Sequence, residues 1–199
     1  MTTDPQQPDP HRPDLHPWAA NLDTLYAQVW ARLVRGVHDR HAPARHPTFA
    51  TVSPDGFPEV RTVVLRAADP VACTLDIHTD VASAKVASLR HTPRASVHVW
   101  DASAHLQSRI EVEVAILTGA QVAAIWARVP DPSRQSYGTV PPPGVAIADA
   151  LAYEKIPNPA SFAVLRCTVR AIDAVHLGPQ HRRARFEAAH GWAGQWLAP

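Results

Sequence analysis

Two short runs of apolar and β-branched residues, 49–52 and 60–65, lie on either side of a Pro-Asp-Gly sequence at 54–56. In such a turn, proline fixes φ, aspartate caps the turn and glycine accepts a positive φ. Strand-forming runs joined in this way predict a β-hairpin. The second run contains Arg61, and side-chain alternation in a strand places Arg61 on the face of two apolar residues of the same run.

The second strand of this hairpin has an arginine at each end, Arg61 and Arg66. A strand of this kind suits an anionic ligand, because a guanidinium can donate several hydrogen bonds to one anion. The alternative is that both arginines belong to an edge strand and reach into water.

Apolar residues recur at steps of three and four before the hairpin, which predicts an amphipathic helix ending before Pro43. The positions that carry this pattern are Trp18, Leu22, Leu25, Val29, Leu33 and Val37.

The remainder of the chain is mainly strand-like. A helix is expected over 80–91 with Asp80 as its N-cap, and a capping-box pattern at Thr118 predicts a second helix through 122–126. Many short strands with turns between them favour a closed antiparallel barrel, so the expected fold class is mainly β with flanking helices. The predicted strands are 73–79, 94–100, 107–117 and 161–172, followed by one strand or a pair over 174–177 and 181–187.

Proline marks two irregular segments. Residues 1–17 contain five prolines and almost no large apolar side chain, which predicts a disordered tail before a single domain over 18–199. Seven prolines fall between 129 and 160, where a long connection with a short helix over 145–153 is expected. A connection of this length is usually functional or disordered.

Composition excludes several classes of protein. The formal net charge is +1, which gives no general attraction to nucleic acid or to a membrane surface. No apolar run is long enough to span a bilayer, and the N-terminal residues lack a signal-peptide pattern, so a cytoplasmic protein is expected. The two cysteines and twelve histidines show no ligand spacing, and no metal site is predicted.

The clearest candidate chemistry is anion binding, since nucleophile-elbow, Walker and dinucleotide-binding motifs are all missing from the sequence. The predicted helix over 80–91 begins directly after a strand, and helix N-termini favour phosphate. Thr79, Ser83 and Lys85 lie at this point, and Arg61 would complete a phosphate site if the hairpin converged on it. The alternative is a solvated helix start with an ordinary lysine.

Four motifs in a fixed order give a resemblance to a known family. These are the hairpin with 61–66 (RTVVLR), then 78–85 (HTDVASAK), 93–100 (PRASVHVW) and 107–112 (QSRIEV). Together they resemble the pyridoxamine 5'-phosphate oxidase-like group of FMN-binding split barrels, and more closely its uncharacterised branch than the true oxidases. The resemblance implies an antiparallel FMN-binding split β-barrel, FMN as cofactor, and a homodimer with the site between two subunits. Strands 94–100 and 161–172 also have more apolar residues than one small barrel would bury.

The resemblance also implies roles for individual residues. Arg61 and Lys85 would hold the FMN phosphate with Thr79 and Ser83, and Gln107 would bind the isoalloxazine or ribityl edge. The strand over 61–66 would lie along the flavin, and Arg183 would reach the cofactor from the C-terminal strand. The full candidate FMN-binding set is Arg61, Thr62, Val63, Val64, Arg66, His78, Thr79, Ser83, Lys85, Gln107 and Arg183; no catalytic residue is assigned.

Two departures from the family pattern matter. Ala84 stands where relatives have an arginine before the lysine, which removes one phosphate contact. The stretch 179–183 (PQHRR) keeps only part of the C-terminal motif with which the true oxidases meet their substrate. The flavin site is therefore better supported than a pyridoxamine 5'-phosphate site.

Three functional hypotheses stay open. The first is an FMN-dependent oxidoreductase acting on an unidentified small molecule, in which FMN carries the electron chemistry. The second is a non-enzymatic flavin carrier or sensor. The third is a related barrel that binds another planar ligand such as haem, with a histidine as ligand.

Overall fold

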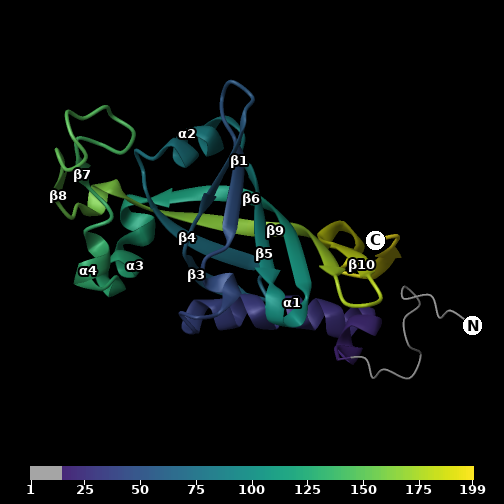
Figure 1. Ribbon diagram of the computed structural model, residues 1–199. Coiled ribbons are helices and arrows are strands. Elements are labelled where there is room, and N and C mark those ends of the chain that lie inside the picture. Colours follow the sequence, from purple (N-terminus) through teal and green to yellow (C-terminus); the bar gives the residue numbers. More distant parts are fainter. Residues whose placement is uncertain (1–14) are drawn as a thin grey trace, which may run out of the picture.

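A computed structural model describes residues 15–199 of the chain. The predicted tail falls largely on residues 1–14, outside the described part. From residue 15 onward, an antiparallel sheet occupies the centre, and a long helix crosses one end of it (Figure 1).

The helices are α1 (Leu22–His38), α2 (Ala84–His91), α3 (Ala123–Arg128) and α4 (Asp131–Arg134). The strands are β1 (Thr48–Val52), β2 (Pro58–Thr62), β3 (Leu65–Asp69), β4 (Thr74–Asp80), β5 (Arg94–Asp101), β6 (Leu106–Thr118), β7 (Thr139–Val140), β8 (Glu154–Lys155), β9 (Phe162–His176), β10 (Arg182–Glu187) and β11 (Gly194–Leu197).

The large sheet is antiparallel throughout and is organised around β9. One edge of this 15-residue strand pairs with β6, and the other edge pairs first with β4 and then with β10. Neighbouring strands are hydrogen-bonded in the order β2–β1–β5–β6–β9–β4–β3. Residues 63–64 connect the two end strands, β2 and β3, in the chain, but these two strands do not pair with each other. The expected fold class is confirmed, and the sheet forms a split barrel rather than a closed one.

The predicted hairpin is confirmed, with Phe49 opposite Arg61 and Thr51 opposite Glu59. Its second strand is shorter than predicted, because β2 ends at Thr62 and the next strand, β3, pairs with β4 instead. The chain crosses here from one end of the sheet path to the other.

Helix α1 confirms the predicted amphipathic helix and packs against β3 and β11. It begins at Leu22 rather than Trp18, because the side chain of Asn21 accepts a hydrogen bond from the backbone N–H of Thr24 at 3.1 Å and caps the helix. Trp18 lies in the preceding 3₁₀ turn, Pro17–Ala20.

Two predicted helix caps are wrong. Asp80 still belongs to β4, where it pairs with Phe162, and Ser83 occupies the N-cap position of α2. Thr118 ends β6 and takes the N-cap position of the 3₁₀ turn Gly119–Val122, but its side chain makes no capping hydrogen bond, and α3 begins only at Ala123. Both caps were predicted from local patterns that strand pairing overrides.

Two other predictions differ from the structure. Residues 174–176 form a strand as predicted, but this strand is the continuation of β9 rather than a separate one. No helix forms over 145–153: the backbone makes only isolated turn hydrogen bonds, and Val145, Ile147 and Leu151 are exposed, so no core packs against a helix there.

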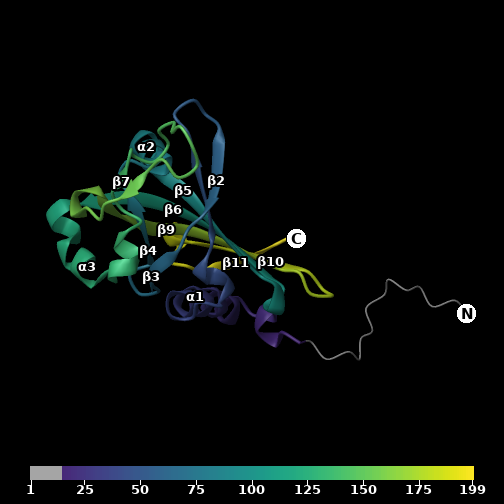
Figure 2. The same ribbon diagram turned by 60° about the vertical axis from the view of Figure 1, so that its left-hand side comes forward.

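The 129–160 segment projects from the barrel and is fixed to it by a small second core. Phe162 and Val164 of β9 form this core with Val122, Val129 and Tyr137. In Figure 1 α2 lies between this segment and the β1–β2 hairpin, and in Figure 2 a loop of the segment overlaps α2 on the side toward the hairpin. Both projections therefore lie on the α2 side of the sheet.

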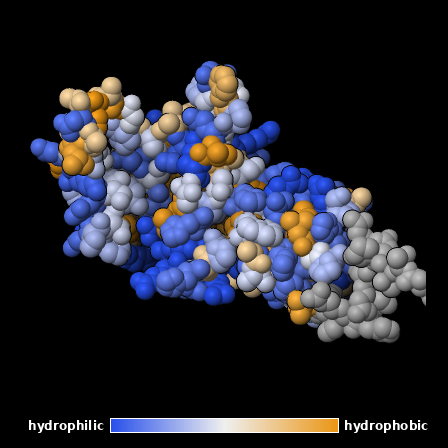
Figure 3. All heavy atoms as spheres, viewed as in Figure 1, coloured by the Kyte–Doolittle hydropathy of each residue, from blue (hydrophilic) through white to orange (hydrophobic). Residues whose placement is uncertain are grey.

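Exposed apolar side chains gather on both projections, as the orange spheres in Figure 3 show. Phe57 and Val60 are about 70 % exposed on the hairpin, and Val145 and Leu151 are exposed on the 129–160 segment. No helix within residues 15–199 is long and apolar enough to cross a membrane.

Candidate functional site

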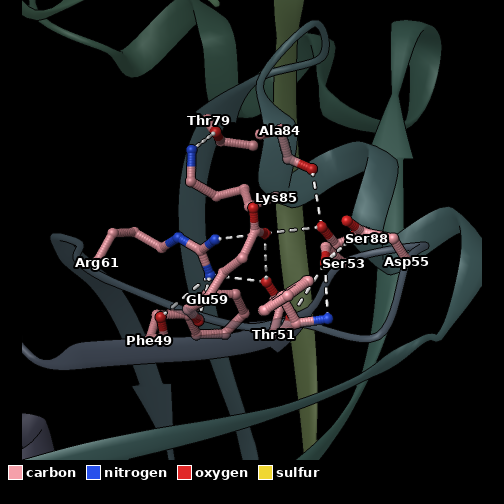
Figure 4. A network of polar contacts seen from close by, with 11 residues as sticks. Phe49, Thr51, Ser53, Asp55, Glu59, Arg61, Thr79, Ala84, Lys85 and Ser88 are labelled. Carbon is pink, nitrogen blue, oxygen red and sulfur yellow. Dashed lines mark hydrogen bonds and ion pairs between the residues drawn. The ribbon is translucent and has the colours of Figure 1, made fainter.

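The guanidinium of Arg61 is held by the two strands of its own hairpin. Its Nη1 donates to the Thr51 hydroxyl at 2.7 Å and to the backbone oxygens of Glu59 and Phe49 at 3.1 and 3.3 Å. Its Nη2 donates to Glu59 Oε2 at 2.9 Å. Figure 4 shows the guanidinium directed at these groups, with Lys85 alongside. The side chain is thus fixed before any ligand arrives.

The edge of Arg61 formed by Nε and Nη2 has room for a further hydrogen-bond acceptor. Nε makes no hydrogen bond to residues 15–199, and Nη2 carries two hydrogens, of which Glu59 accepts one. Arg166 uses the equivalent Nε and Nη2 edge to bind both oxygens of Asp76, at 3.1 and 2.9 Å. The same edge of Arg61 can therefore bind two oxygens of an anion in a planar fork.

A chain of polar groups forms where β4 meets α2. Lys85 Nζ donates to the Thr79 hydroxyl at 2.9 Å, and that hydroxyl lies 3.1 Å from the hydroxyl of Ser83. Burial lowers the pKa of Lys85, the positive charge of Arg61 lowers it further, and Asp80 opposes both effects. The two cations are thus close enough to repel one another, which is the arrangement that a bound dianion would relieve.

The buried carboxylate of Asp80 shapes this turn. Oδ1 accepts from the N–H of Ala82 at 2.8 Å, and Oδ2 accepts from the N–H of Gly138 at 2.8 Å. Gly138 has a φ of 109°, and a Cβ there would lie 2.1 Å from the backbone oxygen of Ile156. Asp80 therefore ties the Thr79–Lys85 turn to the base of the 129–160 segment.

Arg66 and His78 lie at a second place, beneath that segment. Arg66 sits at a register shift between β3 and β4, close to the buried phenol of Tyr137. Burial raises the pKa of Tyr137, while the positive charge of Arg66 opposes this rise. The His78 ring meets Phe162 edge-on at 5.0 Å, and burial, with a smaller effect from Arg66, lowers the pKa of His78 to about 4.

The stability of the fold should therefore depend on pH through His78. Its pKa is about 4 when folded against an ordinary value of 6.5, so between these values the unfolded chain binds more protons and stability falls as pH is lowered. The free energy of unfolding, measured by urea denaturation at a series of pH values, should fall less steeply with decreasing pH for His78→Gln than for the parent. An equal dependence on pH in the two proteins would contradict this assignment.

Gln107 and Arg183 lie elsewhere, on the outer face of the sheet. Both residues pair with Val175 of β9, so their side chains share a face. Arg183 donates to Asp173 from Nε at 3.2 Å and from Nη2 at 2.8 Å, and Arg109 approaches the same carboxylate at 2.6 Å.

Arg61 belongs to the opposite face. It pairs with Phe49, whose row continues through Val97 and Ile110, all fully buried. Gln107 is three positions from Ile110 in the same strand, and an odd number of positions places the two side chains on opposite faces. Gln107 and Arg183 therefore cannot join Arg61 around one ligand within a single chain.

The structure thus brings Arg61 close to Lys85, which is linked by hydrogen bonds to Thr79 and through it to Ser83. Thr62, Val63 and Val64 follow Arg61 in the chain, where β2 ends. It separates Arg66 and His78 into a second group and puts Gln107 and Arg183 on the other face. The sequence interpretation missed Thr51, Glu59 and Ser88, which support Arg61. The predicted hairpin alone could have indicated that Thr51 and Glu59 lie opposite each other. The sequence does not indicate that Ser88 lies close to them.

The family model for the pyridoxamine 5'-phosphate oxidase FMN-binding domain matches residues 16–118. No curated protein matches the chain.

Many solved structures match this fold, among them a pyridoxamine 5'-phosphate oxidase-related, FMN-binding protein from Nostoc punctiforme. Its TM-score is 0.70 at 23 % identity, and the match covers 87 % of this chain and 96 % of that one. PhzG from Burkholderia lata, in complex with tetrahydrophenazine-1-carboxylic acid, has a TM-score of 0.70 at 19 % identity, and the match covers 94 % of this chain and 98 % of PhzG. A Clostridium acetobutylicum protein related to general stress protein 26 has a TM-score of 0.56 at 12 % identity, and the match covers 85 % of this chain and 98 % of that one.

Proposed function

Because the chain belongs to the pyridoxamine 5'-phosphate oxidase family of FMN-binding domains, we propose that it binds FMN and is an oxidoreductase of a small molecule. The observation that carries the proposal is the convergence of the Nε edge of Arg61 with the Lys85–Thr79–Ser83 chain. Two cations offer charge-assisted hydrogen bonds to a phosphate monoester. The Ser83 hydroxyl donates to the backbone oxygen of Asp80 at 2.8 Å and would join them by turning toward the phosphate. The residues present therefore fit the phosphate of FMN.

In this proposal the protein binds and orients the flavin. Arg61 and Lys85 would hold the phosphate, and the backbone at Val63 and Val64, between β2 and β3, would contact the flavin. Bound FMN would supply the electron transfer, as cofactors of this kind do. Arg66 supplies a positive charge to the second group, beside His78 and Tyr137.

The direct test is a visible spectrum of the purified protein, followed by titration with FMN. Flavin absorption or saturable quenching of FMN fluorescence supports the proposal. A colourless protein without FMN affinity would overturn it, and a Soret band would indicate haem instead. Bleaching of the flavin by a donor under anaerobic conditions separates an enzyme from a carrier.

We further propose that the complete site needs two copies of the chain, with Gln107 and Arg183 contributed by the second subunit. Two observations support this: these side chains lie on the opposite face of the sheet from Arg61, and apolar side chains are exposed on both projections beside α2. Light scattering at micromolar concentration should give the mass of a dimer.

Mixed dimers provide a sharper prediction. Arg61→Ala and the double variant Gln107→Ala/Arg183→Ala should each bind FMN weakly. When the two variants are refolded together, half of the dimers should contain one copy of each. Such a mixed dimer has one intact site, with Arg61 from one subunit and Gln107 and Arg183 from the other. About one quarter of all sites should therefore bind FMN again. Arg61→Ala refolded alone is the control. Mixed dimers that form without recovering FMN binding would contradict the shared site.

A further inference from the structure

We propose that Glu59 is a positioning residue of the phosphate site: its carboxylate fixes Arg61 in the orientation that binds FMN. The inference rests on the proposed FMN binding and adds a residue that would not touch the cofactor. A carboxylate beside a phosphate site would ordinarily be expected to weaken binding, so its presence at this position requires an explanation.

Glu59 closes a ring of hydrogen bonds with Arg61 and Thr51. Oε2 of Glu59 accepts from Arg61 Nη2 at 2.9 Å and from the Thr51 hydroxyl at 3.4 Å, while Thr51 accepts from Arg61 Nη1 at 2.7 Å. The Thr51 side chain is buried, and that of Arg61 is 22 % exposed. The ring therefore fixes the side of the guanidinium that faces the protein and leaves the Nε edge outside it (Figure 4).

The same oxygen also reaches helix α2. Ser88, a buried residue of this helix, donates from its hydroxyl to Glu59 Oε2 at 3.0 Å. Lys85 lies one turn earlier on α2 and bears the second cation of the site. One carboxylate thus connects β1, β2 and α2, and it sets the position of Arg61 relative to Lys85.

The charge of Glu59 persists at neutral pH. The hydrogen bond from Ser88 lowers its pKa, and the hydrogen bond and charge of Arg61 lower it further. Glu59 therefore acts on phosphate in two opposite ways, by repelling it and by orienting its main ligand. Because Arg61 is a long side chain that otherwise samples many rotamers, the orienting effect should prevail.

The test compares Glu59→Ala and Glu59→Gln with the parent for binding of FMN and of riboflavin, which lacks the phosphate. Glu59→Ala should bind FMN about tenfold more weakly, as expected for a lost hydrogen bond to a charged group. Glu59→Gln keeps an acceptor for Arg61 and should bind at least as well as the parent. Riboflavin affinity should be the same for all three proteins.

Two further variants complete the design. Asp39→Ala removes a carboxylate that pairs with Arg35 at 2.8 Å at the far end of α1, and it should leave FMN binding unchanged. Thr51→Val breaks the ring without changing charge and should also weaken FMN binding, which keeps the inference testable if Glu59→Ala unfolds. Circular dichroism checks the fold of each variant.

Each possible result either supports or overturns the proposed role of Glu59. Weaker FMN binding by Glu59→Ala, restored by Glu59→Gln, supports positioning. Binding by Glu59→Ala equal to or tighter than the parent's overturns it, as does Glu59→Gln being as weak as Glu59→Ala, or an equal loss for riboflavin. A parent protein that does not bind FMN overturns the proposed function itself, whereas a parent that binds FMN while Glu59→Ala is unaffected overturns only the role of Glu59.

Discussion

Arg61→Ala is expected to weaken FMN binding by about 2–4 kcal/mol, or about 30- to 1,000-fold, the range for two hydrogen bonds between charged groups. Two physical effects add to each other. The phosphate loses the fork at Nε and Nη2, and Glu59 loses the cation that neutralises it at 2.9 Å. The remaining carboxylate then repels the phosphate, which Lys85 alone must hold.

Arg61→Lys should recover only part of the loss, because an ammonium is a point charge and cannot bind two oxygens in a plane. Lys85→Ala should weaken FMN binding less than Arg61→Ala does. Quenching of FMN fluorescence measures each affinity, and Arg35→Ala, on the exposed surface of α1, is the control for loss of an arginine. If Arg61→Ala binds like the parent while Lys85→Ala does not, the phosphate is assigned to the wrong strand. If neither change matters, the phosphate site lies elsewhere.

Phe162→Ala is expected to lower the free energy of unfolding by about 3–5 kcal/mol, as for other large-to-small changes at buried aromatic positions. Phe162 is fully buried, and its ring lies 4.9 Å from that of Tyr137, 5.0 Å from His78 and 5.2 Å from Trp126. The change would remove the centre of the second core, which fixes the 129–160 segment to the barrel.

Chemical denaturation followed by circular dichroism measures the loss of stability, and limited proteolysis shows whether cleavage rises within 129–160. The matched control is Phe57→Ala on the exposed hairpin tip, where a change within about 0.5 kcal/mol is expected. Equal stability of Phe162→Ala and Phe57→Ala would show that the second core contributes little.

Elements specified by local chemistry were predicted well from the sequence. The period-two alternation of 107–117 predicts both faces of β6, with Ile110 and Val112 inside and Arg109 and Glu111 outside. The hairpin follows from its turn residues, and α1 follows from its apolar stripe. In each case the determining residues lie within a few positions of one another.

Elements decided by distant partners were not predicted. Asp80 has the pattern of a helix cap, but pairing with Phe162, some eighty positions later, keeps it in a strand. The break at residues 63–64 depends on the position of β4, which the local sequence does not contain. Glu59 becomes a partner of Arg61 only once the β1–β2 register and the placement of Ser88 on α2 are known.

The central position of β9 has a consequence for synthesis of the chain on the ribosome. Its partners β4 and β6 emerge first, and both must wait with unpaired hydrogen-bonding edges until residues 162–176 have been made. Exposed strand edges of this kind favour association with other chains, and pairings this distant in sequence form slowly. The barrel can therefore be completed only after β9 has been made, and until then the open edges of β4 and β6 are the positions at which the nascent chain is most prone to associate with other chains.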